Sequence, residues 1–193
     1  MDREAASAAI VAFLRALGHA PEGDLADTGR LVAEAWSSDL LDGAAIDPVA
    51  TLRDGAVASG VHEREGMVAL RDLSVFMMCP HHLLPALGHA DVIYRPGPQV
   101  AGFGAVVKAL RGCTRKLTLQ ERAGAELCHA LVHGLEAEGA LCRLRMTHTC
   151  LAARGPRETR ATVETLAVAG SFRDDPEAHR RAMALLSLGG TGS

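Results

Sequence analysis

The chain has 193 residues, enough for one domain with a substantial core that needs no cross-links. Hydrophobic residues make up 48% and aromatic residues only 3%, which favours helices and leaves little surface for stacking on nucleic-acid bases. The net charge of -3 excludes the basic footprint of a protein that binds nucleic acid or an anionic membrane.

The N-terminus and the distribution of apolar residues indicate where in the cell the protein is located. No apolar run approaches the roughly 20 residues of a membrane-spanning helix. The sequence MDREAAS begins with charge, unlike a signal peptide. We therefore expect a cytoplasmic protein without nucleic-acid or membrane partners. In a reducing compartment, five scattered cysteines favour metal-binding or structural roles over a disulfide framework.

Helical periodicity dominates the first part of the chain. Apolar spacing predicts a helix over 4–18 and, after a turn-rich stretch, a second over 29–41. The apolar side of the second helix carries Leu31, Val32 and Trp36. We expect residues 1–60 to form an N-terminal helical region.

From residue 61 the pattern changes to strands alternating with helices. Strands are predicted over 66–79, 86–96, 140–155 and 160–172. Helices are predicted over 104–112, 117–139 and 176–188. We expect residues 61–188 to form a second domain, followed by a flexible tail at 189–193.

Alternation in the strand after Ala140 places chemically active side chains together. Side chains of a strand repeat every two residues, so one face carries Cys142, Leu144, Met146, His148 and Cys150. That face is apolar until it ends in a histidine and a cysteine. One buried face thus terminates in two groups that can bind metal.

The segment MMCPHHLLP supplies partners for those groups. Cys79 and His82 stand in a C-x-x-H spacing, short enough for both side chains to converge on one ion. Zinc accepts thiolate and imidazole together, and a catalytic zinc uses three protein ligands plus water. Cys150 is the natural third ligand, which leaves His81 and His148 beside the metal as proton-transfer groups.

The spacing leaves a second interpretation open, in which these are a buried free cysteine and hydrogen-bonded core histidines. The remaining cysteines have weaker claims to a metal, and Cys128 is most simply a small core residue of a helix. Cys113 and Cys142 are the other two. We expect surface or packing roles for His89, His129, His133 and His179.

Several linked motifs resemble the GTP cyclohydrolase I family. They are CPHHLLPALGHADVIYRP, LTLQER and HTCLAARG, in the family's order and at its intervals. The stretch LADTGRLVAEAW also resembles the family's N-terminal helix. The resemblance covers about residues 10–172, nearly the whole chain.

The resemblance implies a set of roles. In the family, zinc is held by residues that correspond to Cys79, His82 and Cys150, while His81 and His148 assist the chemistry. Zinc-bound water attacks the purine C8, the imidazole ring opens, formate is lost, and the ribose then rearranges to close a dihydropterin ring. The cofactor implied is Zn²⁺ and the substrate is a small-molecule purine.

The Q-E-R motif corresponds to Gln120, Glu121 and Arg122. In the family the glutamate accepts hydrogen bonds from guanine N1–H and the amino group, with the glutamine nearby. The residues alone favour a different interpretation. Thr118, followed three residues later by Glu121, forms a capping box at the start of the long helix. With the resemblance, we expect Glu121 to bind substrate, and a partial capping role stays open.

Departures from the family pattern concentrate on the triphosphate site. In the segment GFGAVVK, the family's serine, lysine and arginine are replaced by Gly104, Ala105 and Lys108, respectively. In the N-terminal helix, Leu31 stands for arginine and Glu34 for lysine. Arg154 is unchanged and, with Lys108, remains available to hold a phosphate.

These losses suggest a diverged paralogue. Phosphates need several charge-assisted donors, so fewer cations predict a guanine-like substrate with fewer phosphates or none, with GTP itself the other candidate. The other departure is Pro80, which stands where the family has glutamate between Cys79 and His81. Proline fixes φ and removes a donor, which stiffens the turn, and the change removes a negative charge near the metal.

The resemblance implies an α+β tunnelling fold (T-fold). Its catalytic domain has a four-stranded antiparallel sheet with two long helices on one face, preceded by N-terminal helices. Sheets of several subunits join into a barrel, as a homo-oligomer that is commonly a decamer, with active sites between chains. The alternative function is a non-catalytic T-fold protein that binds a purine or pterin, or serves as a partner subunit. A structural zinc domain is disfavoured because three ligands leave one position open.

Overall fold

The computed structural model describes residues 1–188, apart from the side chain of Glu63. The predicted tail at 189–193 lies outside the described residues. The chain divides into two compact units between Asp42 and Gly43, and each unit is described by itself. Among the described residues, no helix combines the length and apolar character needed to cross a membrane.

The first unit is helical, as the sequence predicts. Its first helix begins at a carboxylate cap, where Asp2 Oδ1 accepts the N–H of Ala5 at 2.9 Å. The helix predicted over 29–41 is divided, since an α-helix gives way to a π-helical turn, and Leu31 is 52% exposed rather than part of an apolar side. The elements are α1 (Arg3–Ala16), η1 (Gly23–Leu25), α2 (Thr28–Ala35) and η2 (Trp36–Leu40).

The second unit is built on an antiparallel sheet. Its four strands are β2 (Val68–Met78), β3 (Pro85–Arg95), β5 (Gly139–His148) and β6 (Val163–Gly170). They lie in the order β2-β3-β5-β6, and each neighbouring pair is antiparallel. The predicted four-stranded antiparallel sheet is therefore confirmed. A separate two-stranded sheet pairs β1 (Ala56–Ala58) with β4 (Gln99–Ala101).

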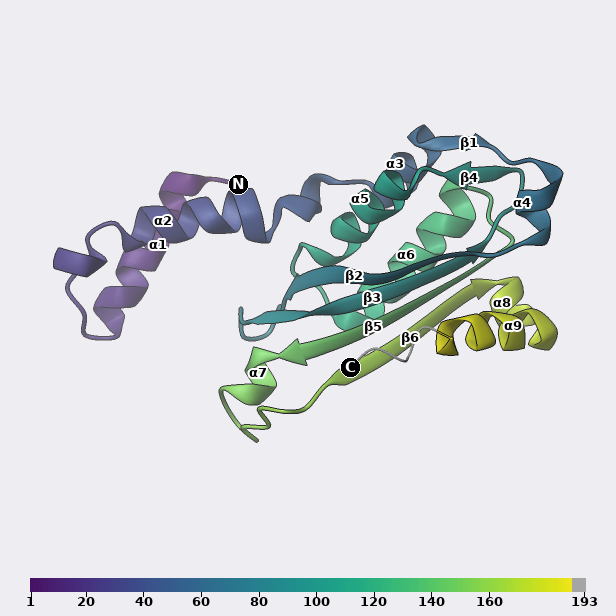
Figure 1. Cartoon of the computed structure of the whole chain (residues 1–193). Coiled ribbons are helices and arrows are strands. Elements are labelled where there is room, and N and C mark those ends of the chain that lie inside the picture. Colours follow the sequence, from purple (N-terminus) through teal and green to yellow (C-terminus); the bar gives the residue numbers. More distant parts are fainter. Residues whose placement is uncertain (189–193) are drawn as a thin grey trace. The chain divides into compact units, whose positions relative to one another are not determined.

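Helices cover both faces of the four-stranded sheet (Figure 1). On one face lie α5 (Phe103–Thr114) and α6 (Gln120–Gly134), which confirms the two long helices predicted there. Fully buried Leu127 and Leu131 of α6 belong to the same core as Val92 and Leu144 of the sheet. The remaining elements are η3 (Asp42–Ala45), α3 (Pro48–Asp54), α4 (Val61–Glu65), α7 (Thr149–Ala152), α8 (Ser171–Asp174) and α9 (Pro176–Ser187).

A second apolar cluster lies on the opposite face of the sheet. Ile93 and Leu141 face away from α6 and pack with Phe172 of α8 and Leu186 of α9. The closing helix predicted from the sequence is confirmed, and it covers part of the sheet face that α5 and α6 leave free (Figure 1).

The division of the chain differs from the boundary expected at residue 60. Residues 43–60 belong to the second unit because α3 packs beside α5 and α6. Its Leu52 is fully buried in the same core as Leu131. The segment also contains β1, so it is not purely helical.

A buried ion pair fixes the polar part of the second sheet face. Asp91 on β3 is 3% exposed, and its Oδ2 accepts hydrogen bonds from Arg143 Nε at 2.9 Å and Nη2 at 2.7 Å. Its Oδ1 accepts the backbone N–H of Asp72, a residue with φ 50° at a bulge in β2. Burial raises the pKa of Asp91, but the hydrogen bonds and charge of Arg143 outweigh burial and hold it below the ordinary value. One carboxylate thus links three strands.

We expect Asp91→Asn to lower the free energy of unfolding by about 2–3 kcal/mol at pH 7, since Arg143 loses its buried charged partner and keeps the longer contact of Nη1 with Glu164 Oε1 at 3.5 Å. Because the pKa of Asp91 is lowered on folding, its contribution is full above about pH 3.9 and disappears as the pH falls through the lower native pKa. Urea unfolding at a series of pH values should therefore show the two proteins converging in acid.

The exposed Asp174 gives a matched control. Asp174→Asn should change the free energy of unfolding by less than about 0.5 kcal/mol. A gap between wild type and Asp91→Asn that stays constant below pH 3.9 would contradict the assignment of the ion pair.

Candidate metal and substrate site

Cys79 and His82 lie in the turn that joins β2 to β3. The N–H of Cys79 donates to Leu84 O at 3.0 Å, and the N–H of Leu83 donates to Cys79 O at 3.0 Å. Pro80 has no N–H, and neither of these bonds uses one from it, so proline fits this turn. The turn brings Cys79 Sγ to 3.8 Å from His82 Nδ1.

Cys150 approaches this turn from the end of β5. The strand ends at His148, and Cys150 lies on the short helix α7, so the prediction that it continues the strand face is wrong. Two contacts hold α7 in place. His148 is paired with Ala86 of β3, and Thr149 Oγ1 donates to Pro85 O at 2.6 Å.

The three side chains form a group of metal-ligand geometry. Cys79 Sγ, Cys150 Sγ and one ring nitrogen of His82 lie within 4.8 Å of one another, and no other group of this kind occurs among the described residues. Sulfur and nitrogen ligands of a tetrahedral zinc ion are about 3.5 Å apart, close to the 3.8 Å between Cys79 Sγ and His82 Nδ1. The donor set and its spacing therefore fit zinc.

The remaining cysteines belong to the core, in line with their expected weaker claim. Cys113 and Cys128 are buried, and burial raises the pKa of each thiol to about 12. Burial also raises the pKa of Cys142 well above its ordinary value. By contrast Cys150 is only partly buried; burial and the neighbouring Cys79 raise its pKa, and a bound cation would oppose that shift.

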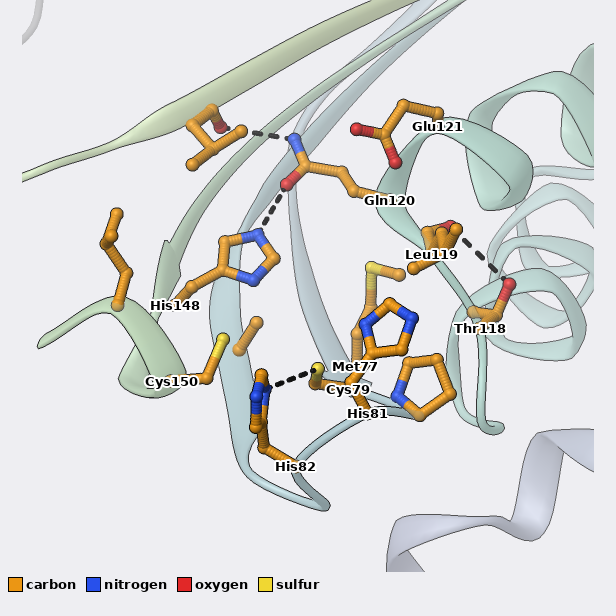
Figure 2. A pocket seen from close by; sticks show the side chains of 14 residues that line it. Met77, Cys79, His81, His82, Thr118, Leu119, Gln120, Glu121, His148 and Cys150 are labelled. Carbon is orange, nitrogen blue, oxygen red and sulfur yellow. Dashed lines mark hydrogen bonds between the residues drawn. The ribbon is translucent and has the colours of Figure 1, made fainter. Parts of the chain in front are cut away.

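His148 faces the metal-ligand group from the last position of β5 (Figure 2). Its Nε2 lies 2.7 Å from Gln120 Oε1. Burial lowers the pKa of His148, while the charge of Glu121 partly offsets this effect, so the neutral ring is favoured. His81 also lines the pocket, with its ring centroid 6.1 Å from that of His82.

Glu121 lines the same pocket from the first turn of α6. The capping-box interpretation is wrong, because α6 begins after Leu119 without a side-chain cap. The hydroxyl of Thr118 donates instead to Leu119 O at 3.4 Å. The exposed carboxylate of Glu121 is therefore not engaged in a capping box.

The two cations assigned to substrate binding lie in different places. Arg154 is exposed and its Nη1 lies 2.8 Å from His82 Nε2, beside the metal-ligand group. Lys108 is exposed on α5 and is not among the residues that line this pocket. Arg154 does not line the pocket either, but it contacts His82, which does, whereas Lys108 has no such contact with a metal-ligand residue among the described residues.

Apolar side chains complete the pocket, and sequence reasoning missed them. They are Met77, Leu119, Leu151 and Val163. Each of the four is next to a residue of the motifs or lies on a predicted strand. The sequence does not show that they meet in one pocket, because this depends on the register of the sheet. Sequence reasoning also missed Thr149, whose contact with Pro85 places α7.

Comparisons of the sequence with known proteins point to one family. The family model described as GTP cyclohydrolase I matches residues 6–187. The chain is 37% identical to GTP cyclohydrolase 1 of Chromobacterium violaceum over 154 residues, which cover 80% of this chain and 73% of that protein. It is 34% identical to GTP cyclohydrolase 1 of Leifsonia xyli subsp. xyli over 190 residues, 97% of each. Among solved structures, the archaeosine synthase QueF-Like in the apo form aligns with a TM-score of 0.42 at 15% identity, covering 54% of this chain and 93% of that one.

Proposed function

Since the chain belongs to the GTP cyclohydrolase I family, which has the tunnelling fold, we propose that it hydrolyses the imidazole ring of a guanine-type purine at C8. The observation that carries the proposal is one pocket lined by a Cys79–His82–Cys150 group together with His81, His148 and Glu121. Metal ligands, proton-transfer groups and a carboxylate acceptor are the parts that this hydrolysis needs.

The metal proposed for the site is zinc, held by Cys79, His82 and Cys150. When bound by three protein ligands, zinc lowers the pKa of water to about 7 and so supplies a nucleophile near neutral pH. The thiolate and imidazole donors disfavour Mg²⁺ or Ca²⁺, which prefer oxygen ligands.

His148 and His81 are the proposed proton-transfer groups. Both line the pocket beside the metal-ligand group, and imidazole exchanges protons near neutral pH. Opening the ring breaks a C–N bond, so the departing nitrogen must gain a proton and the attacking water must lose one. Two histidines on one pocket can serve both transfers.

Glu121 is proposed to recognise the base. An ionised carboxylate only accepts hydrogen bonds, and the N1–H and 2-amino groups of guanine are two adjacent donors that it can bind together. The apolar side chains of Leu119 and Leu151 on the pocket wall would contact the faces of the ring and exclude water.

The proposed substrate carries fewer phosphates than GTP, or none. Gly104 and Ala105 offer no cation at the start of α5, and Glu34 on α2 pairs with Arg30 at 3.2 Å. Each charged hydrogen bond to a phosphate contributes about 1.5–3 kcal/mol, so the missing cations weaken triphosphate binding more than base binding. GTP remains the competing substrate, with Arg154 and Lys108 as its phosphate contacts.

We also propose that the chain works as a homo-oligomer, with a decamer expected from the family. Among the described residues, β2 and β6 are the edges of the sheet, and β2, which is 11 residues long, pairs on its outer side only at Met78, through a bridge to Leu117. Long free edges favour pairing with another chain. Assembly would also allow Lys108 to reach the pocket of a neighbouring subunit, since it does not line the pocket of its own chain.

Protein purified without chelators should contain roughly one zinc ion per chain, measured by inductively coupled plasma mass spectrometry. Cys150→Ser or His82→Ala should reduce the content to a small fraction, because two ligands bind zinc far more weakly than three. The control is Cys113→Ala, which changes a buried cysteine outside the group and should keep full zinc content. Zinc-free wild-type protein would favour a non-catalytic purine- or pterin-binding subunit.

Formate release should be compared for GTP, GMP and guanosine. We expect kcat/KM for GMP or guanosine to equal or exceed that for GTP, because the triphosphate gains few contacts. Turnover confined to GTP would refute the altered-substrate proposal while leaving the hydrolase proposal intact.

The same assay can test whether the missing cations of α5 cause the expected weak binding of GTP. Gly104→Ser with Ala105→Lys restores the family residues, and a Cβ at Gly104 meets no atom within 4 Å. This pair should lower KM for GTP about 10-fold, equal to about 1.4 kcal/mol. As a control for added charge, Val107→Lys places a lysine at an exposed position of α5 and should leave KM for GTP unchanged.

Static light scattering should give a mass of several subunits, near ten by family resemblance. A stable monomer with full activity would contradict the assembly proposal, because the sheet edges and Lys108 would then have no partner.

A further inference from the structure

We propose that Gln120 is a positioning residue, which holds His148 with a hydrogen on Nε2 and a free lone pair on Nδ1. The catalytic meaning of this arrangement rests on the proposed function. The arrangement itself rests only on hydrogen bonds within the chain.

The orientation of the Gln120 amide follows from its partners. The side chain is 3% exposed, so its bonds are made within the protein. Its nitrogen lies 2.9 Å from Leu144 O and 3.1 Å from Val163 O. Backbone carbonyl oxygens can only accept hydrogen bonds, so this end of the amide must be the NH₂ group. Thr165 Oγ1, at 3.1 Å, is a third acceptor within reach of it.

The other end of the amide then determines the ring. Gln120 Oε1 lies 2.7 Å from His148 Nε2, and a carbonyl oxygen cannot donate. His148 Nε2 must therefore carry the hydrogen. In a neutral imidazole this leaves Nδ1 as the acceptor, since the hydrogen bond at one ring nitrogen fixes the state of the other.

The free nitrogen lies on the side where the chemistry is proposed. In Figure 2 the ring edge opposite Gln120 is turned towards Cys79, His82 and Cys150. The lone pair of Nδ1 is therefore directed towards the metal-ligand group, while the hydrogen bond to Gln120 fixes the orientation of the ring.

This assignment changes the role expected for Gln120. The three acceptors of its NH₂ group come from β5 and β6, and its oxygen already accepts from His148, so the amide has no donor left to offer a purine. Its neighbour Glu121, on the exposed side of α6, is left to bind the base. Gln120 thus positions the histidine, and Glu121 binds the substrate.

The tautomer can be observed directly. In a long-range ¹H–¹⁵N correlation spectrum of the full chain loaded with zinc, the His148 signal is the one absent from His148→Gln. We expect a protonated Nε2 and an unprotonated Nδ1 in the wild type. A neutral His148 with hydrogen on Nδ1 would overturn the inference, and no substrate or turnover is involved in this readout.

Two variants separate positioning from structural support. Gln120→Met keeps the length of the side chain and removes the acceptor, so the Nε2–H pattern should be lost. Thr165→Val removes one acceptor of the amide but leaves both carbonyl partners, and should keep that pattern. If Gln120→Met folds and retains the wild-type pattern, the inference fails; if it does not fold, the wild-type spectrum still decides.

Kinetics give a second readout once a substrate is known. We expect Gln120→Met to lower kcat about 10- to 100-fold with little change in KM, as for other partners that orient a reacting group. A large rise in KM at constant kcat would show that Gln120 binds substrate instead. A chain with the expected tautomer but no turnover of purines would refute the proposed function and leave the hydrogen-bond assignment standing.

Discussion

The pairing of β3 with β5 is the constraint on which the site depends. It sets His148 opposite Ala86, next to the turn that carries Cys79 and His82, and so brings two distant sequence motifs to the same end of the sheet. The hydroxyl of Thr149 then bonds to Pro85 and turns the chain into α7, which presents Cys150. A shift of one residue in this register would move His148 to the other face of the sheet and separate the ligands.

The sheet also explains why the two halves of the pocket have different character. The metal-ligand side is built from strand ends and a tight turn, where backbone hydrogen bonds set the position of each side chain. The side proposed to bind the base is the start of α6, anchored to β5 and β6 through the buried amide of Gln120. Gly104 and Ala105, which occupy two of the positions that the family resemblance assigns to the triphosphate, lie on α5, and no residue of α5 lines the pocket, so substitutions there leave the pocket walls unaltered.

Much of the fold follows from local patterns, because helical and strand periodicity record which face of an element is buried. The motifs likewise identified the polar residues that line the pocket, but not its apolar wall. Periodicity does not show where a strand ends, so Cys150 was expected on β5 although it lies on α7. It also does not distinguish a capping box from a carboxylate that faces a pocket, since Thr118 and Glu121 have the right spacing for both. The role of Gln120 depends on carbonyl groups of two other strands, which no local pattern records.

The separation of the ligands along the chain has a consequence for folding. Cys79 and Cys150 are 71 positions apart, and nearly half of the second unit lies between them. An ion held by both would close a long loop, whose entropic cost is otherwise borne by packing alone. It would bind the native chain in preference to the unfolded one and so shift the folding equilibrium by mass action. The cluster proposed to bind zinc for hydrolysis would then also serve the chain as a cross-link, in place of the disulfides it lacks among the described residues.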